Sequence, residues 1–160
     1  MLGEQRVQEA IESGLPAVIA RPAGIYGPGR VQLLRRVADG SAWASPSVER
    51  WANLVHRDDA AALSLHLLQH PAPPSVVHGV DDEPVPRRLL LAELRALIAG
   101  RPLERASATA ATMGKRVRND SLHAVGHALV HPSWRGGYAS ALAADPALAA
   151  ELARSGAGTR

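Results

Sequence analysis

The sequence has no cysteine and no phenylalanine among its 160 residues, and aromatic residues make up only 3% of it. Without cysteine the chain has neither a disulfide nor a thiol nucleophile, so thiol catalysis is excluded. The first residues carry Glu4 and Arg6 instead of an apolar leader, and no uncharged apolar stretch is long enough to cross a membrane. We therefore expect a cytoplasmic protein of bacterial type with no membrane partner.

Lysine is almost absent as well, because Lys115 is the single lysine among 18 basic residues and the others are arginines. The pI near 10.2 thus reflects guanidinium groups that stay charged to very high pH, while the net charge is only +3. The arginines are spread along the chain between acidic residues, and few aromatic side chains are present to stack on bases. A basic nucleic-acid-binding module is therefore disfavoured and is kept only as an alternative.

What is present is an alternation of helical and strand-like segments. Residues 17–20 and 75–80 are short apolar runs bounded by prolines or an acidic turn, which is typical of buried parallel strands. The strongest helical pattern covers residues 86–99, where leucines form one face. The predicted order is helix 3–13, strand 17–20, loop 24–30, helix 30–39, irregular chain 41–50, strand 52–56, helix 58–70, strand 75–80, helix 86–99, loop 107–114, helix 119–125, strand 127–131 and a helical tail 137–154.

This order indicates an α/β fold. Only the strands 17–20 and 75–80 have the pattern of a buried parallel sheet, whereas sheets usually have about five or six strands. A parallel sheet of two strands leaves both of its edges unpaired. The sequence therefore predicts a part of a larger α/β fold.

Three segments resemble the signatures of a known family. Residues 21–30 are Arg-Pro-Ala-Gly-Ile-Tyr-Gly-Pro-Gly-Arg, residues 53–60 are Asn-Leu-Val-His-Arg-Asp-Asp-Ala, and residues 114–119 are Gly-Lys-Arg-Val-Arg-Asn. In this order they resemble the C-terminal portion of an atypical extended short-chain dehydrogenase/reductase, of the NAD-dependent epimerase/dehydratase family, over about residues 3–144. The resemblance implies the last two strands of a Rossmann-like doubly wound parallel sheet and a small, mostly helical substrate-binding lobe.

The resemblance also implies a division of the chain, with residues 1–154 forming a single incomplete domain. Residues 1–40 and 72–100 would be the remnant of the Rossmann-like sheet and its helices. Residues 41–71 and 101–144 would form the substrate lobe, and residues 155–160 are expected to be a disordered tail.

Two chemical features of the family are missing from these 160 residues. A dinucleotide fingerprint needs glycines at i, i+2, i+5 or at i, i+3, i+6, and none of the 14 glycines has either spacing. The family's Tyr-x-x-x-Lys proton-transfer pair is missing too, because Ala111 lies four residues before Lys115. We assign no catalytic residue and expect the chain to be inactive alone. By resemblance the complete protein binds NAD or NADP and acts by hydride transfer on a small or nucleotide-linked carbohydrate.

Seven residues are binding candidates by the same resemblance. Two positions depart from the family, because Gly24 stands where relatives often have a substrate-binding Asn, and Ala52 stands where nucleotide-sugar epimerases commonly have a diphosphate-binding Arg. These departures weaken the case for a sugar nucleotide as the substrate. A packed ring is the structural alternative for Tyr26, a solvated side chain is the alternative for Arg30, and a hydrogen bond that pins the loop is the alternative for His56. The candidates are Pro22, Ala23 and Gly24 for the cofactor, and Tyr26, Arg30, Asn53 and His56 for the substrate.

The spacing of His123, His127 and His131 would place three imidazoles on one helix face, but Gly126 interrupts that helix and Pro132 follows it. No metal site is therefore predicted. The main alternative to a catalytic assembly is a non-catalytic binding or regulatory module, which stands alone or pairs with a separate N-terminal Rossmann half. An exposed apolar edge at the strand 17–20 would favour such a partner.

Overall fold

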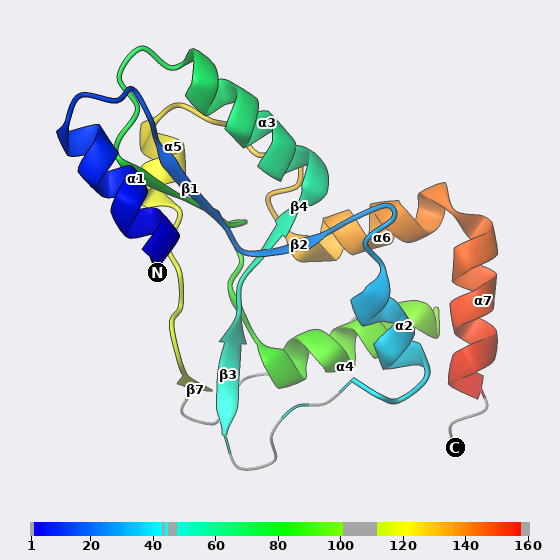
Figure 1. The fold of residues 1–160 in the computed structure, drawn as a ribbon. Helices are drawn as coiled ribbons and strands as arrows, with labels where there is room; N and C mark the ends of the chain where they lie inside the picture. Colours follow the sequence, from blue (N-terminus) through cyan, green and yellow to red (C-terminus); the bar gives the residue numbers. More distant parts are fainter. Residues whose placement is uncertain (1, 43, 45–47, 101–111, 158–160) are drawn as a thin grey trace.

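The computed structural model describes residues 2–42, 44, 48–100 and 112–157, and helices alternate with short strands along them (Figure 1). None of the helices in these ranges is long and apolar enough to cross a membrane. The helices are α1 (Leu2–Glu12), α2 (Gln32–Ala38), α3 (Arg57–Gln69), α4 (Arg87–Ile98), α5 (Asp120–Ala124), α6 (Trp134–Ala144) and α7 (Pro146–Ala157). The strands are β1 (Ile19–Pro22), β2 (Gly24–Tyr26), β3 (Glu49–Ala52), β4 (Leu54–His56), β5 (Val76–Gly79), β6 (Val85–Pro86) and β7 (Thr112–Met113).

The strands form three small sheets. β1 and β5 pair in parallel from Ile19 opposite Val76 to Pro22 opposite Gly79, which confirms the α/β fold and the parallel pairing. The strand expected at 17–20 begins two residues later, at Ile19, and none of the four residues of β1 is buried, so the expectation of a buried strand is wrong there. β2 and β4 form a second parallel pair, and β3 lies between β6 and β7 in the third sheet. The chain passes from the first sheet to the second at Ala23, whose N–H donates to the carbonyl of Gly79.

Two of the strands lie where the sequence predicts loops. β2 occupies the start of the predicted loop 24–30, and β3 occupies the end of the irregular stretch 41–50. Both strands are three or four residues long and pair with segments distant in sequence, so no local alternation of apolar and polar residues reveals them. Residues 107–111 of the predicted loop 107–114 lie outside the described ranges.

The predicted strand 127–131 is wrong, because this segment has no strand pairing. The backbone N–H groups of Val130 and His131 donate instead to the carboxylate of Asp59, at 2.7 and 2.9 Å. A buried side chain thus satisfies the donors that a sheet would otherwise use.

The helical tail divides into two helices at Asp145 instead of running unbroken from residue 137 to residue 154. A residue before proline is disfavoured in the helical conformation, and Pro146 starts α7 while the Asp145 carboxylate accepts the N–H of Leu148. α7 packs against α2 and α4 and continues to Ala157, past residue 155 where the disordered tail was expected to begin. Residues 158–160 of that expected tail lie outside the described ranges.

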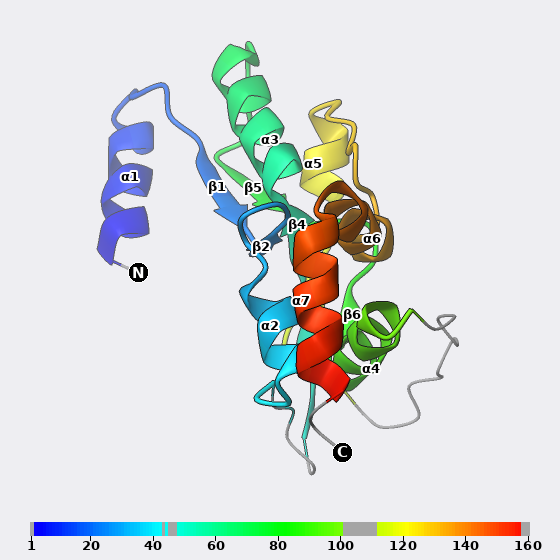
Figure 2. The same ribbon diagram turned by 90° about the vertical axis from the view of Figure 1, so that its right-hand side faces the viewer.

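Most of the buried apolar side chains form one cluster between α2, α4, α6 and α7, and a smaller cluster joins α3, β5 and α5. Helix α1 is not part of either cluster, and it stands beside β1 at the margin of the molecule (Figure 2). None of its residues from 3 to 12 is buried, and Glu4 forms an ion pair with Arg21 of β1. The apolar residues Val7, Ala10 and Ile11 of α1 are therefore only partly buried.

Candidate functional site

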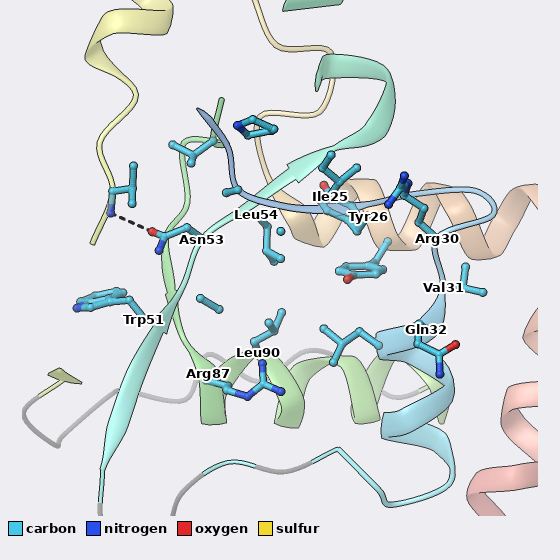
Figure 3. Close-up of a pocket in the computed structure, with 18 of the residues that line it drawn as sticks. Ile25, Tyr26, Arg30, Val31, Gln32, Trp51, Asn53, Leu54, Arg87 and Leu90 are labelled. Carbon is cyan, nitrogen blue, oxygen red and sulfur yellow. Dashed lines mark hydrogen bonds between the residues drawn. The ribbon is translucent and has the colours of Figure 1, made fainter. Parts of the chain in front are cut away.

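A cavity of about 850 Å³ opens where the two parallel strand pairs meet α2 and α4 (Figure 3). Six of the seven residues expected from the sequence line it, namely Pro22, Ala23, Gly24, Tyr26, Arg30 and Asn53. His56 does not line it and lies behind Tyr26. One cavity therefore brings together the residues expected for the cofactor and most of those expected for the substrate.

The backbone from Pro22 to Gly24 forms one wall because it is tied to two sheets at once. The N–H of Ala23 donates to β5, while the N–H of Gly24 donates to the carbonyl of Asn53 at 3.0 Å. A Cβ at Gly24 would lie 3.2 Å from that same carbonyl oxygen. These two hydrogen bonds fix the position of the backbone at Ala23 and Gly24 in the cavity wall.

Tyr26 fills the floor of the cavity and is almost fully buried. Its ring stacks on Tyr138 with centroids 4.4 Å apart and meets His56 edge to face. Burial, with a smaller contribution from Asp81, raises the pKa of the Tyr26 hydroxyl well above its usual range, so the group stays protonated. The Tyr26 ring therefore packs the floor of the cavity, and its protonated hydroxyl is not available as a base.

The rim of the cavity is cationic. Arg30 is exposed and forms no ion pair within the described ranges, whereas Arg21 is paired with Glu4 and Arg35 with Glu151. No aspartate or glutamate of the described chain lines the cavity, but four arginines do: Arg21, Arg30, Arg35 and Arg87. Such a rim attracts ligands that carry negative charge.

Trp51 supplies an aromatic surface that the sequence analysis does not assign to the site. It lies at the opposite end of the cavity from Arg30, and the guanidinium of Arg116 sits 5.2 Å from the centre of its ring (Figure 3). Trp51 and Arg87 reach the cavity from β3 and α4, elements that pair or pack only in the folded chain. The one sequence signal for Trp51 is its place two residues before Asn53.

Asn53 lines the cavity, but its amide group is already engaged in holding the backbone. Its NH₂ group donates to the carbonyl of Lys115 at 3.0 Å, and its Oδ1 accepts the N–H of Val117 at 2.9 Å. Val117 itself lines the cavity. Asn53 therefore positions a second wall of the cavity through the segment 115–117.

His56 ends β4, caps the start of α3 and is only 2% exposed. Its Nδ1 accepts the N–H of Asp58, which caps the helix, and its ring lies against His131 with centroids 3.8 Å apart. Burial and then the neighbouring His131 lower the pKa of His56, so the ring is neutral at neutral pH. This side chain supports the cavity from behind and does not face it.

Two buried acids near the site are not among the residues expected from the sequence. Asp59 of α3 holds the segment before α6 through the hydrogen bonds described above. Asp81 follows β5, and its Oδ1 accepts the N–H of Glu83 while its Oδ2 has no partner within the described ranges. Burial raises the pKa of Asp81 to about 8. Asp59 lies next to Asp58 at the start of α3, and Asp81 lies next to Asp82 in an acidic turn. From sequence alone such neighbouring acids are expected to be solvated or to favour the helix N-terminus, and not to be buried.

The three histidines with the i, i+4, i+8 spacing are not brought together. His123 pairs with Asp82, His127 lies beside His66, and His131 stacks on His56. The helix that would align the first two ends at Ala124, so their sequence spacing does not persist in space.

The arrangement is one for binding. Within the described ranges the cavity combines a fixed backbone wall, a packed aromatic floor and a cationic rim, and Lys115 does not line it. The Gly27 backbone packs closely against His56, because a Cβ at Gly27 would lie 2.8 Å from Nε2 of that ring.

No protein-family model matches the sequence, and no curated protein is significantly similar to it. Solved structures do match. A Methylobacillus flagellatus protein described as a candidate NAD-dependent epimerase/dehydratase is 32% identical, with a TM-score of 0.69 over 85% of this chain and 50% of its own. WbmF from Bordetella bronchiseptica, in complex with NAD⁺, is 16% identical, with a TM-score of 0.63 over 95% of this chain and 53% of its own. RMD from Pseudomonas aeruginosa, complexed with NADPH, is 22% identical, with a TM-score of 0.60 over 88% and 51%. The chain thus spans about half the length of the solved proteins that it matches.

Proposed function

The chain resembles the NAD-dependent epimerase/dehydratase family in its sequence motifs and in its partial Rossmann-like fold, and on this premise we propose that it is the substrate-binding portion of an NAD(P)-binding enzyme of that family. The observation that carries the proposal is the single cavity lined by six of the seven residues that the resemblance selects. The proposed location is the cytoplasm, as expected from the sequence.

In the complete protein the cofactor is NAD or NADP, and the backbone of Pro22, Ala23 and Gly24 would border its nicotinamide. The fixed position of this backbone segment in the cavity wall supports that role. The phosphate cradle and the proton-transfer pair are not among these 160 residues, so the chain alone is expected to bind no dinucleotide and to catalyse no reaction.

The proposed partner is a separate Rossmann half. β1 is paired only with β5 among the described strands, and its other edge is open near the partly buried apolar face of α1. A further parallel strand at this edge would extend the sheet and bring apolar cover to α1. The coverage of about half of each matching structure supports the same arrangement.

The substrate is proposed to be a small molecule with negative charge, of which a nucleotide-linked sugar is one example. Arg30 is free to make a two-pronged contact to phosphate, and Trp51 offers a surface for a base or sugar ring. Tyr26 shapes the floor, and Asn53 and His56 hold the walls around it.

Calorimetric titration of the purified chain tests the substrate side, with uridine diphosphate as the probe. We expect binding that Arg30→Ala weakens by at least tenfold, since one charge-assisted contact is worth roughly 1.5–3 kcal/mol. Arg36→Ala is the matched control, because Arg36 is an exposed arginine of the same region that does not line the cavity. Equal losses in both variants, or no binding by the unmodified chain, would contradict a phosphate-binding rim.

The cofactor side is tested with the chain alone and in a chimera. Alone, the chain should bind neither NADH nor NADPH and show no turnover. A chimera in which the chain replaces the matching half of the Methylobacillus flagellatus protein should bind one of the two. Turnover by the isolated chain, or a folded chimera that binds neither nucleotide, would refute the proposal.

A non-catalytic binding module is the second candidate. Its support is the large apolar cluster between α2, α4, α6 and α7, which gives the chain a core of its own. Ligand affinity distinguishes the two functions. A stand-alone module binds its ligand with the same affinity with or without a Rossmann half, whereas the portion of an enzyme binds its ligand more tightly in the chimera.

A further inference from the structure

We propose that His56, Asp58 and His131 form a binding site for a divalent transition metal ion of the Zn²⁺ class. One potential ligand atom from each of the three residues lies within 4.8 Å of the other two. The residues come from the junction of β4 and α3 and from the segment that leads into α6, and these lie side by side (Figure 1). This juxtaposition exists only in the folded chain, since His131 is 72 residues from the aspartate that holds it.

The separation of the ligand atoms suits tetrahedral coordination. Bonds from Zn²⁺ to imidazole nitrogen or carboxylate oxygen are about 2.0–2.2 Å long, which puts neighbouring ligand atoms roughly 3.3–3.6 Å apart. Nδ1 of His56 and Oδ2 of Asp58 are 3.6 Å apart. The lone pair of Nδ1 points to the Asp58 side, because this nitrogen accepts the N–H of Asp58 in a long hydrogen bond of 3.3 Å. A metal ion would replace this weak bond, and a small rotation of the His131 ring would complete the three ligands.

Two of the ligands are held in place before any ion binds. His56 is buried and packed edge to face against Tyr26. His131 is fixed through its backbone, whose N–H donates to the buried carboxylate of Asp59 at 2.9 Å. Asp59 thus acts as a positioning residue for the site, because it sets where the second imidazole lies without providing a ligand itself.

The two carboxylate oxygens of Asp58 face different partners, and only one of them binds Arg57. Nε of Arg57 binds Oδ1 at 3.0 Å, whereas Oδ2 is the oxygen that faces His56. An ion on Oδ2 therefore leaves the arginine pair intact. The Asp58 side chain is more than half exposed, so water has access to the fourth coordination position.

The donor set selects the class of ion. Two imidazoles and one carboxylate, without a thiolate, suit Zn²⁺, Co²⁺ or Ni²⁺, whereas Mg²⁺ and Ca²⁺ prefer oxygen ligands. None of the three residues lines the cavity of the candidate site, although His56 packs behind its floor against Tyr26. A bound ion would link the start of α3 to the segment before α6 and stabilise the folded chain.

Calorimetric titration of the full chain with Zn²⁺ tests the proposal, and the visible spectrum of Co²⁺ reports the coordination. We expect one ion per chain, a higher Tm with Zn²⁺, and an intense tetrahedral Co²⁺ spectrum. Asp58→Asn and His131→Ala should each weaken Zn²⁺ binding at least tenfold and abolish the Tm shift. Both residues are at least partly exposed, so the metal-free variants are expected to fold, and circular dichroism checks this.

The controls are His70→Ala and Asp120→Asn, which remove a histidine and an exposed aspartate at a helix start outside the cluster. Both controls should bind Zn²⁺ like the unmodified chain. No Zn²⁺ binding by the unmodified chain, unchanged binding in both cluster variants, or an equal loss in His70→Ala would overturn the proposal.

Discussion

Asp59 and His131 are joined by a hydrogen bond of 2.9 Å from the backbone N–H of His131 to the Asp59 carboxylate, which also accepts the N–H of Val130. Because Asp59 is 1% exposed, Asp59→Ala removes the acceptor of two partly buried N–H groups and should lower the free energy of unfolding by about 2 kcal/mol. Asp58→Ala, at the exposed neighbour, should cost less than about 1 kcal/mol. Urea unfolding followed by tryptophan fluorescence measures both, and similar losses would contradict the clamp.

Gly136 and Gly137 are adjacent in α6 but differ in the space around them. A Cβ at Gly137 would lie 2.2 Å from the hydroxyl oxygen of Tyr26, which is buried and cannot move away freely, whereas a Cβ at Gly136 meets no atom within 4 Å. Gly137→Ala should therefore destabilise the chain by about 2–3 kcal/mol. Gly136→Ala should stabilise it by up to about 1 kcal/mol through helix propensity. Thermal unfolding of the pair gives the comparison, and a stabilised Gly137→Ala variant would show that Tyr26 does not pack here.

The elements that the sequence predicts are those with a strong local pattern. The apolar runs of β1 and β5 and the leucine face of α4 follow from neighbours along the chain. β2 and β3 escape prediction because their pairing partners are distant in sequence. The segment 127–131 alternates like a strand, yet the carboxylate of Asp59 takes its N–H groups, and no local pattern announces such a distant acceptor.

The sequence predicts part of the candidate site, as it predicts part of the fold. Pro22, Ala23, Gly24, Tyr26, Arg30 and Asn53 follow from the family resemblance and line one cavity, although their binding roles stay predictions. Trp51 and Arg87 could not be assigned, because they reach the cavity through the packing of β3 and α4. The sequence also does not reveal that the amide of Asn53 is occupied by the backbone at Lys115 and Val117.

Asp81 should make the stability depend on pH. Burial raises its pKa from an ordinary value near 3.8 to about 8 in the folded chain, so between these pH values the unfolded chain loses a proton that the folded chain keeps. Its contribution to the free energy of unfolding therefore falls as pH rises from 4 to 8. Asp81→Asn removes this effect and should stabilise the chain by about 1–3 kcal/mol at pH 8, with little gain at pH 4. Urea unfolding at four pH values checks this, and a gain that does not change with pH would contradict it.

Asn53 should control the order of the cavity wall at Val117. Asn53→Ala removes both hydrogen bonds to the segment 115–117, so the Val117 amide loses its acceptor and should exchange its hydrogen about tenfold faster, as expected for a bond worth roughly 1.4 kcal/mol. Asn53→Asp is the matched variant, because its carboxylate still accepts the Val117 N–H and only the donor to Lys115 is lost. Exchange at Val117 should then stay close to that of the unmodified chain, while the free energy of unfolding falls slightly in both variants. Hydrogen exchange resolved at Val117 by NMR distinguishes the two, and equal acceleration in Asn53→Ala and Asn53→Asp would mean that the bond to Lys115, not the one to Val117, orders this wall.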